Sequence, residues 1–314
     1  MAKKFISFVL VLILVCTILV PVSASSVDRI GCYSITTPYA YPVLPGTDEW
    51  QSLSMDQRIA VSHVNEDIVQ SMTTEAVLLT TLRYPFAVNI FAYNTGREGI
   101  DIVKKYCSSL AELLIREDAL PTINAYLNTT TNTESIEYYV AEKLWEYMSN
   151  SAAIEPRYII APGTGLRVFY VETPNGSSVP VYKDMTWYDH GTTYEEQSTQ
   201  NARLKDVYGV ISVGDIDPSY NCHSYAWYSA STSNIYWMDN PYNYINDGSY
   251  VAGTGAAGDR ITYNSSATRY DHSGIVTSAG TITSKWGALG LFEHSVYACP
   301  YYLEAAAIYF WRRS

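Results

Sequence analysis

Hydrophobic residues recur every three or four positions through the first half of the chain, a spacing typical of amphipathic helices. Helix-start signals agree with this pattern, because Ser54 is followed three residues later by Gln57, and a second helix begins near Thr73 and is ended by Pro85. The clearest helix is expected over about residues 96–116. Its apolar face consists of Ile100, Val103, Cys107, Leu110 and Leu114, which makes Cys107 a small buried hydrophobic residue. A last helix is expected over about residues 134–148.

After residue 157 the pattern changes to alternating β-branched and aromatic residues, which indicates strands. Residues 168–171 and 179–182 flank the turn signal Pro174-Asn175-Gly176, so we expect a β hairpin. The polar residues 184–205 are expected to link it to the last part of the chain. In that part Gly258-Asp259 leads into one strand, residues 271–276 form a second, and a turn at 278–280 leads into a third.

These patterns predict an α+β protein with an N-terminal helical bundle, a short β hairpin region, and a C-terminal helix packed on an antiparallel sheet. The expected segments are an extended lead-in at 25–50, a helical domain at 51–151, the hairpin and linker at 152–205, and a C-terminal module at 206–314.

Residues 1–24 stand apart from this organisation. Lys3 and Lys4 precede a predominantly apolar run that ends in the small residues before Ser25. The run is shorter than a bilayer requires, so we expect a signal peptide and no stable membrane span after its removal. The protein is then secreted or held at the cell surface.

Charge narrows the possible partners. The chain has a formal net charge of −11 and 47% hydrophobic residues, which excludes a disordered chain and a basic nucleic-acid-binding protein. Residues 201–314 carry seven basic and nine acidic side chains, so no strong field draws this module toward a phosphate-rich polymer. We expect no nucleic-acid partner, and a neutral or cationic one instead.

One of the four cysteines that follow the signal peptide has a distinctive setting. Asn221 is a good helix cap and no Gly or Pro follows before residue 230, so Cys222 should lie in the first turn of a helix. Free N–H groups at a helix start favour a thiolate. His272 lies near the start of a later strand, and this is the order found in papain-like hydrolases. There an imidazole takes the thiol proton and the thiolate attacks a carbonyl.

Three motifs from Asp217 to about His294 carry a resemblance to a known family. They are Asn221-Cys222-His223-Ser224, Gly258-Asp259 and His272-Ser273-Gly274-Ile275. In this order they are similar to the motifs of NlpC-type cell-wall peptidases and of the cysteine, histidine-dependent amidohydrolase/peptidase (CHAP) domains. The resemblance implies a papain-like fold for residues 206–314, with Cys222 as nucleophile and His272 as base. His223 and Ser224 depart from the family's Ser and Gly.

The third, orienting residue of this family lies about a dozen residues beyond the histidine, which points to Ser284. A hydroxyl can accept the imidazole N–H, although more weakly than a carboxylate or amide oxygen. A register shift of one residue would exchange the faces of Ser284 and Lys285. His294 could approach from a neighbouring strand and is the alternative third residue.

Several side chains near these motifs are candidates for the substrate cleft. They are His223, Tyr225, Trp237, Lys285 and Trp286. Aromatic residues at such positions also commonly form a core, which is the competing interpretation. Cys299 is expected to be structural, and the motifs call for no cofactor and no metal.

Three functions fit the sequence. The first is a secreted cysteine hydrolase that cleaves an amide or peptide bond, for example in a cell-wall peptide, through a thioester intermediate. The second is a transglutaminase-like acyl transferase. The third is a surface binding module on a papain-like scaffold whose catalytic machinery has lapsed.

The mature protein is expected to begin near Ser25, because the apolar run is short and ends in small residues. Intact-mass measurement of the medium and the cell-associated fraction checks this. Recovery of only the full-length, membrane-embedded chain would contradict it.

Overall fold

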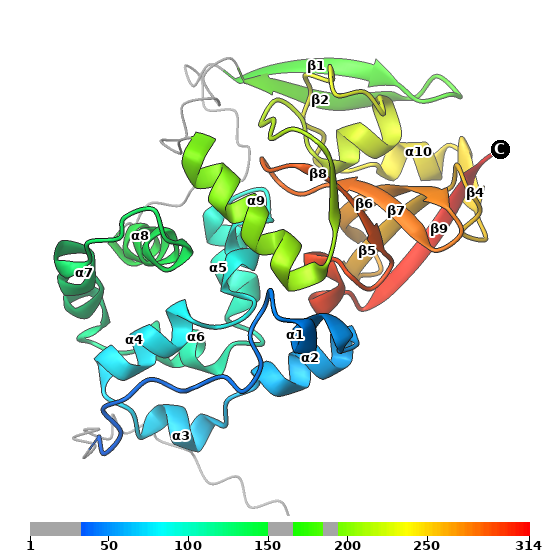
Figure 1. The fold of residues 1–314 in the computed structure, drawn as a ribbon. Coiled ribbons are helices and arrows are strands. Elements are labelled where there is room, and N and C mark those ends of the chain that lie inside the picture. The colour runs from blue at the N-terminus through cyan, green and yellow to red at the C-terminus, as the bar shows by residue number, and fades with distance from the viewer. Residues whose placement is uncertain (1–32, 150–165, 185–193) are drawn as a thin grey trace, which may run out of the picture. The chain divides into compact units, whose positions relative to one another are not determined.

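The computed structural model describes residues 33–149, 166–184 and 194–314, so the predicted signal peptide, Cys32 and the segments between these ranges lie outside it. The described chain mixes helices and strands, with helices first and an antiparallel sheet at the C-terminal end (Figure 1). The α+β expectation is confirmed at this level. The helices are α1 (Asp48–Ser52), α2 (Met55–Ser62), α3 (Glu66–Gln70), α4 (Thr74–Leu82), η1 (Ala87–Phe91), α5 (Gly96–Val103), α6 (Ser108–Leu113), α7 (Ala119–Thr129), α8 (Ile136–Ser149), α9 (Tyr194–Tyr208), η3 (Ser224–Tyr228), α10 (Tyr242–Asn246) and η4 (Pro300–Glu304).

Helix caps in the N-terminal half follow the sequence signals. Ser54 and Gln57 form a reciprocal capping box at the start of α2, and Thr73 caps α4, which ends before Pro85. The single helix predicted over 96–116 is wrong, because α5 and α6 are separated by an extended residue, Cys107, at φ −113° and ψ 97°. The break turns the Cys107 thiol into the core, 3.3 Å from Ser109 Oγ, so its predicted burial is confirmed.

The second half of the segment expected to be a polar linker, 184–205, lies in the helix α9. The helix is polar along most of its length, and this hid it from the hydrophobic pattern. Its buried apolar residues, Leu204, Val207 and Tyr208, cluster at its C-terminal end and join the main core. Tertiary packing at that end therefore fixes a helix that periodicity does not reveal.

The strands form two separate sheets. They are β1 (Leu166–Glu172), β2 (Ser178–Asp184), β3 (Ile211–Gly214), β4 (Tyr250–Ala252), β5 (Arg260–Ser266), β6 (Arg269–Ser278), β7 (Thr281–Lys285), β8 (Leu291–Ser295) and β9 (Ala307–Arg313). β1 and β2 make the predicted hairpin, and Gly176 takes the positive φ of 86° that its turn requires. The other seven strands form one antiparallel sheet in the order β3-β8-β7-β6-β5-β9-β4.

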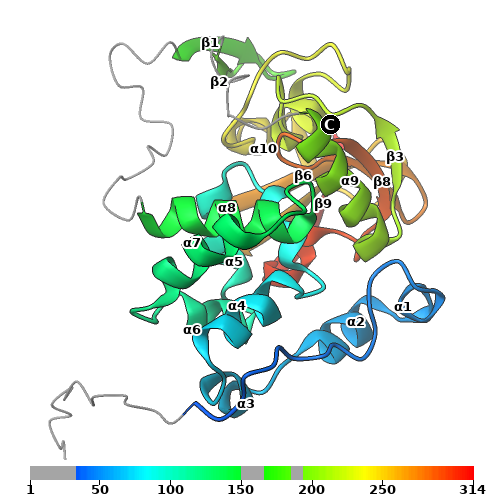
Figure 2. The same ribbon diagram turned by 60° about the vertical axis from the view of Figure 1, so that its left-hand side comes forward.

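The helices and this sheet share one hydrophobic core. Trp50, Phe86 and Tyr93 of the helical half belong to the same cluster as Trp286 and Tyr301 of the C-terminal half. Hydrogen bonds cross between the halves as well, since Tyr93 Oη donates to Pro300 O at 3.3 Å and Tyr301 Oη donates to Ala92 O at 3.0 Å. The described residues between 33 and 314 accordingly belong to one compact unit, shown from a second side in Figure 2. The predicted segment boundaries stay a prediction about how the chain folds.

Within the described ranges, no helix combines the length and the apolar character needed to cross a bilayer.

The contact between α5 and η1 gives a stability prediction. A Cβ at Gly99 would lie 2.1 Å from the backbone oxygen of Ile90, whereas a Cβ at Gly96 would meet only the flexible side chain of Lys143. Gly99→Ala should therefore lower the free energy of unfolding by about 3 kcal/mol or more, since backbone must move. Gly96→Ala is the matched control and should stay within about 1 kcal/mol of the wild type. Urea denaturation measures both, and equal effects would contradict the close packing of α5 on η1.

Candidate functional site

Cys222 lies at the start of the helical turn that leads into η3, as the sequence predicts. Asn221 caps this turn, because its Oδ1 accepts the backbone N–H of Ser224 at 3.1 Å and of Met238 at 3.1 Å. The Cys222 thiol is fully buried, and its sulfur accepts the backbone N–H groups of Ser273 and His223. The nucleophile candidate is thus fixed against β6, beside the residue that follows His272.

The protonation of this thiol differs from the expectation. Burial raises the pKa of Cys222 to about 12, and the two backbone N–H groups oppose this rise without cancelling it. The expected lowering of its pKa at a helix start is therefore wrong for this buried arrangement, because desolvation outweighs the helix terminus. Burial likewise raises the pKa of Cys107 to about 11 and raises that of Cys299.

His272 is fully buried on β6 and is joined to both candidate third residues through one hydroxyl. His272 Nε2 lies 3.0 Å from Ser284 Oγ on β7, and the same oxygen lies 2.7 Å from Nε2 of His294 on β8. Trp286 Nε1 donates to Ser284 Oγ at 3.0 Å. The register of β7 therefore turns Ser284 toward His272, which decides the alternative that the sequence left open between Ser284 and Lys285.

The direction of each hydrogen bond in this network follows from the tautomer of His294. His294 Nδ1 lies 2.8 Å from the carbonyl oxygen of Ser295, so Nδ1 carries the proton and Nε2 accepts. Ser284 must then donate its O–H to His294 and accept from His272 Nε2–H. This leaves His272 Nδ1 as a bare lone pair, and that atom is buried without a hydrogen-bond partner. His272 is consequently held in the tautomer that a general base requires.

Burial keeps this network uncharged. It lowers the pKa of His294 to about 4 and that of His272 well below its ordinary value, where the neighbouring His294 and His223 add to the effect. Tyr301 of η4 stacks on the His272 ring with centroids 4.1 Å apart and planes 10° apart. Among the described contacts, no hydrogen bond joins the Cys222 sulfur to the His272 ring.

His223 belongs to a second neutral network, on the other side of β6. Its Nε2 donates to Tyr270 O at 3.0 Å, so its Nδ1 accepts from Ser273 Oγ at 2.8 Å, and that oxygen accepts Trp227 Nε1–H at 2.9 Å. Burial lowers the pKa of His223 to about 4. His223 therefore fixes β6 to η3 and is not free to exchange protons in this arrangement.

Lys285 has a structural explanation that the sequence did not supply. Its buried ammonium donates to the carbonyls of Gly287 and Leu289 and lies over the Tyr220 ring, 5.2 Å from the centroid. Burial lowers its pKa to about 7. The side chain ties the turn after β7 to the segment that precedes Cys222.

Asp259 also has a structural role. Its Oδ2 accepts the backbone N–H groups of Thr254, Gly255 and Ala256 at 2.9–3.1 Å. The Gly258-Asp259 pair therefore organises the loop that enters β5.

The remaining cleft candidates contribute to the core. Tyr225, Trp237 and Trp286 are buried, and Trp237 Nε1 donates to Pro218 O at 2.7 Å. Of the five residues predicted for the cleft, His223 is the one that borders the polar cavity described next.

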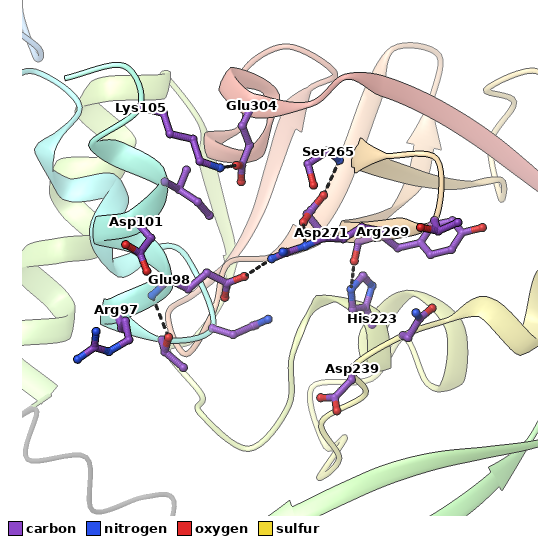
Figure 3. A pocket seen from close by; sticks show the side chains of 16 residues that line it. Arg97, Glu98, Asp101, Lys105, His223, Asp239, Ser265, Arg269, Asp271 and Glu304 are labelled. Carbon is purple, nitrogen blue, oxygen red and sulfur yellow. Dashed lines mark hydrogen bonds and ion pairs between the residues drawn. The ribbon is translucent and has the colours of Figure 1, made fainter. Parts of the chain in front are cut away.

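A polar cavity of about 530 Å³ lies between α5, the β5–β6 hairpin and η4 (Figure 3). No sequence pattern by itself indicates this cavity, because its walls come from segments far apart in the chain. The alternation of Arg269 and Asp271 just before His272 was the one signal available. The lining residues with ionisable side chains are Arg97, Glu98, Asp101, Lys105, His223, Asp239, Arg269, Tyr270, Asp271 and Glu304.

No protein-family model, curated protein or solved structure matches this chain. Among the described residues, no group of three or more His, Cys, Asp or Glu side chains is arranged to hold a metal ion.

The buried imidazoles predict a pH dependence of stability. The unfolded chain takes up a proton at each histidine near pH 6.5, whereas His223 and His294 stay neutral down to about pH 4 in the fold. Their contribution to stability is therefore complete above about pH 6.5 and declines as the pH falls toward 4, by up to about 1.4 kcal/mol per pH unit each. Urea unfolding of wild type and His294→Asn at several pH values tests this.

The His294→Asn variant should be less stable at about pH 7 but should lose less further stability on acidification. His63→Gln, which changes an exposed side chain, is the control and should keep the wild-type slope. An unchanged slope in His294→Asn would contradict the neutral, buried state of His294.

Proposed function

We propose that the protein is a secreted cysteine hydrolase with a papain-like C-terminal module, which cleaves an amide or peptide bond such as one in a cell-wall peptide. The single observation that carries this proposal is the tautomer of His272. His272 Nε2–H is bonded to Ser284, and His272 Nδ1 has no hydrogen-bond partner. The next residue, Ser273, donates its backbone N–H to the Cys222 sulfur. A buried imidazole in this state is prepared to accept a thiol proton.

The chemistry would proceed in two stages. Cys222 gives its proton to His272 Nδ1, and the thiolate attacks the substrate carbonyl carbon to form a tetrahedral intermediate. The amine leaves with the proton from His272, which yields a thioester. Water then attacks the thioester with His272 again as base, and the carboxylic acid departs as the thiol is restored. The Cys222 backbone N–H is the natural first donor to the oxyanion.

Ser284 and His294 would act by positioning His272. Ser284 accepts the Nε2–H, and its own O–H is fixed by His294. This chain keeps the ring orientation and stabilises the imidazolium as it forms, in the role that a carboxylate or amide has in related triads. A neutral hydroxyl supplies less stabilisation than a carboxylate, so a modest rate is expected.

Catalysis on this proposal requires η4 to move. Cys222 and His272 are fully buried, and Tyr301 covers the His272 ring. Displacement of η4 would let substrate and water reach the sulfur. Hydration of the thiol would also remove the desolvation that raises the pKa of Cys222.

The burial of the pair favours a second candidate, a binding module on a papain-like scaffold with lapsed catalysis. In that case the His272 network would be a structural remnant, and the polar cavity would be the functional surface. A transglutaminase-like acyl transferase has no specific observation in its favour.

Loss of the nucleophile should abolish hydrolysis. Cys222→Ala should lower kcat/KM on a cell-wall peptide or another amide substrate by about 10³-fold or more, because the covalent route disappears. Cys107→Ala removes another buried thiol, in the helical half, and is the matched control, with activity close to the wild type. Chromatographic detection of the released amine measures both.

Iodoacetamide labelling of the folded protein at about pH 7 gives a second readout. On displacement of η4, Cys222 should react ahead of Cys107 and Cys299, because the hydrated thiol can then give its proton to His272, and His272→Ala should slow this labelling. Equal reactivity of the three thiols, an unaffected rate in His272→Ala and no hydrolysis by the wild type would together establish the binding module instead.

A further inference from the structure

We infer that the polar cavity between α5, η4 and the β5–β6 hairpin binds an organic cation, the ammonium or guanidinium group of an amino acid or peptide. This inference does not depend on hydrolysis at Cys222, because the cavity residues are distinct from the Cys222–His272–Ser284–His294 network.

The first reason to expect a cation is a buried carboxylate oxygen that has no hydrogen-bond donor. Glu304, on η4, is a cavity wall residue whose side chain is only 8% exposed, and its Oε1 has no hydrogen-bond partner, while its Oε2 accepts from Lys105 at 3.1 Å. Asn94 Oδ1, on the same cavity, is also buried without a donor. Two unpaired oxygens on one cavity call for a ligand that brings N–H donors.

The charged side chains around these oxygens also favour a cationic ligand. Carboxylates outnumber basic side chains in the wall, and each basic side chain already has a partner. Arg269 pairs with Asp271 at 2.6 Å and with Glu98 at 3.2 Å, Lys105 pairs with Glu304, and Arg97 lies over an aromatic ring. In Figure 3 the Glu98–Arg269 pair reaches from α5 to the β5–β6 hairpin, and the Lys105–Glu304 pair lies above it. An anionic ligand would have to break these pairs to reach a basic side chain, whereas a cation could pair with the open Oε1 of Glu304 without breaking any of them.

Three acidic side chains of the wall are affected by burial. Burial raises the pKa of Glu98, of Glu304, and of Asp239 to about 6. A nearby cation would stabilise the ionised form of each.

An organic cation fits better than a metal ion. In the part of the chain that the structure describes, no three carboxylate or imidazole groups converge as metal ligands. The volume of about 530 Å³ lies in the range of small-molecule sites and exceeds what a bare ion needs. An ammonium or guanidinium group on an amino acid or short peptide matches both the size and the donors required.

The test compares amino-acid amides of similar length that do or do not carry a cationic side chain. Nα-acetyl-lysine amide and Nα-acetyl-arginine amide should bind to the full mature chain at least about 10-fold more tightly than Nα-acetyl-norleucine amide, which has a similar length and no charge. Isothermal titration calorimetry measures the Kd of each. Cys222→Ala protein serves in parallel, so that binding is scored without any hydrolysis.

Two variants at one ion pair give opposite expected shifts. Glu304→Gln should weaken binding of the lysine or arginine probe by about 10-fold, because the acceptor charge is lost. Lys105→Gln should tighten it, because Lys105 is the exposed internal cation that occupies the other oxygen of Glu304. Glu66→Gln, an exposed carboxylate on α3, is the matched control and should change nothing.

Thermal melting of each variant checks that it is folded. Equal binding of the three probes by the wild type would overturn the inference whether or not the variants fold. Weaker binding in Lys105→Gln would also overturn it, since a merely structural Lys105–Glu304 pair would not give tighter binding when broken. Failure of hydrolysis with a preserved preference for cations would overturn the proposed function and leave this inference standing.

Discussion

The buried hydroxyl of Ser284 is the interaction on which the candidate site depends. It accepts from His272 and Trp286 and donates to His294, so one fully buried oxygen has three partners. Loss of any partner would leave a buried polar group unpaired, at a cost of about 1–3 kcal/mol. The network is therefore both a constraint on the fold and the reason that His272 has one defined tautomer.

The shared core holds this network in place. β6, β7 and β8 are neighbours in the sheet, and they supply His272, Ser284 and His294 in turn. The helical half closes the same face, since Tyr93 packs on Tyr301 and Tyr301 stacks on His272. The residues that bury the imidazole thus come from both halves of the chain. The same packing of α5 and η4 against the β5–β6 hairpin encloses the cavity, so the two features are properties of one interface.

The sequence predicted the local elements of this arrangement well, because capping and turn chemistry act between near neighbours. Asn221 as a cap and the turn at Gly176 are both of this kind. Ser284 was indicated by the family resemblance instead, and its Oγ lies 3.0 Å from His272 Nε2. The sequence did not predict features that depend on contacts between segments far apart in the chain. The helix around Cys107 is broken to bury a thiol, and α9 is fixed by a few apolar residues at one end. The raised pKa of Cys222 and the cavity at Glu304 also arise from long-range burial, which no local pattern encodes.

The position of the proton on the His272 ring decides whether His272 Nδ1 can accept the Cys222 proton. Long-range ¹H–¹⁵N NMR of the histidine rings at about pH 7, assigned with His272→Gln, reports which nitrogen carries the proton. We expect a neutral His272 with the proton on Nε2, and a neutral His294 with the proton on Nδ1. We also expect that alkylation of Cys222 shifts the His272 Nδ1 resonance. A proton on Nδ1 of His272, or an Nδ1 chemical shift that does not change when Cys222 is alkylated, would contradict the role of His272 as the base.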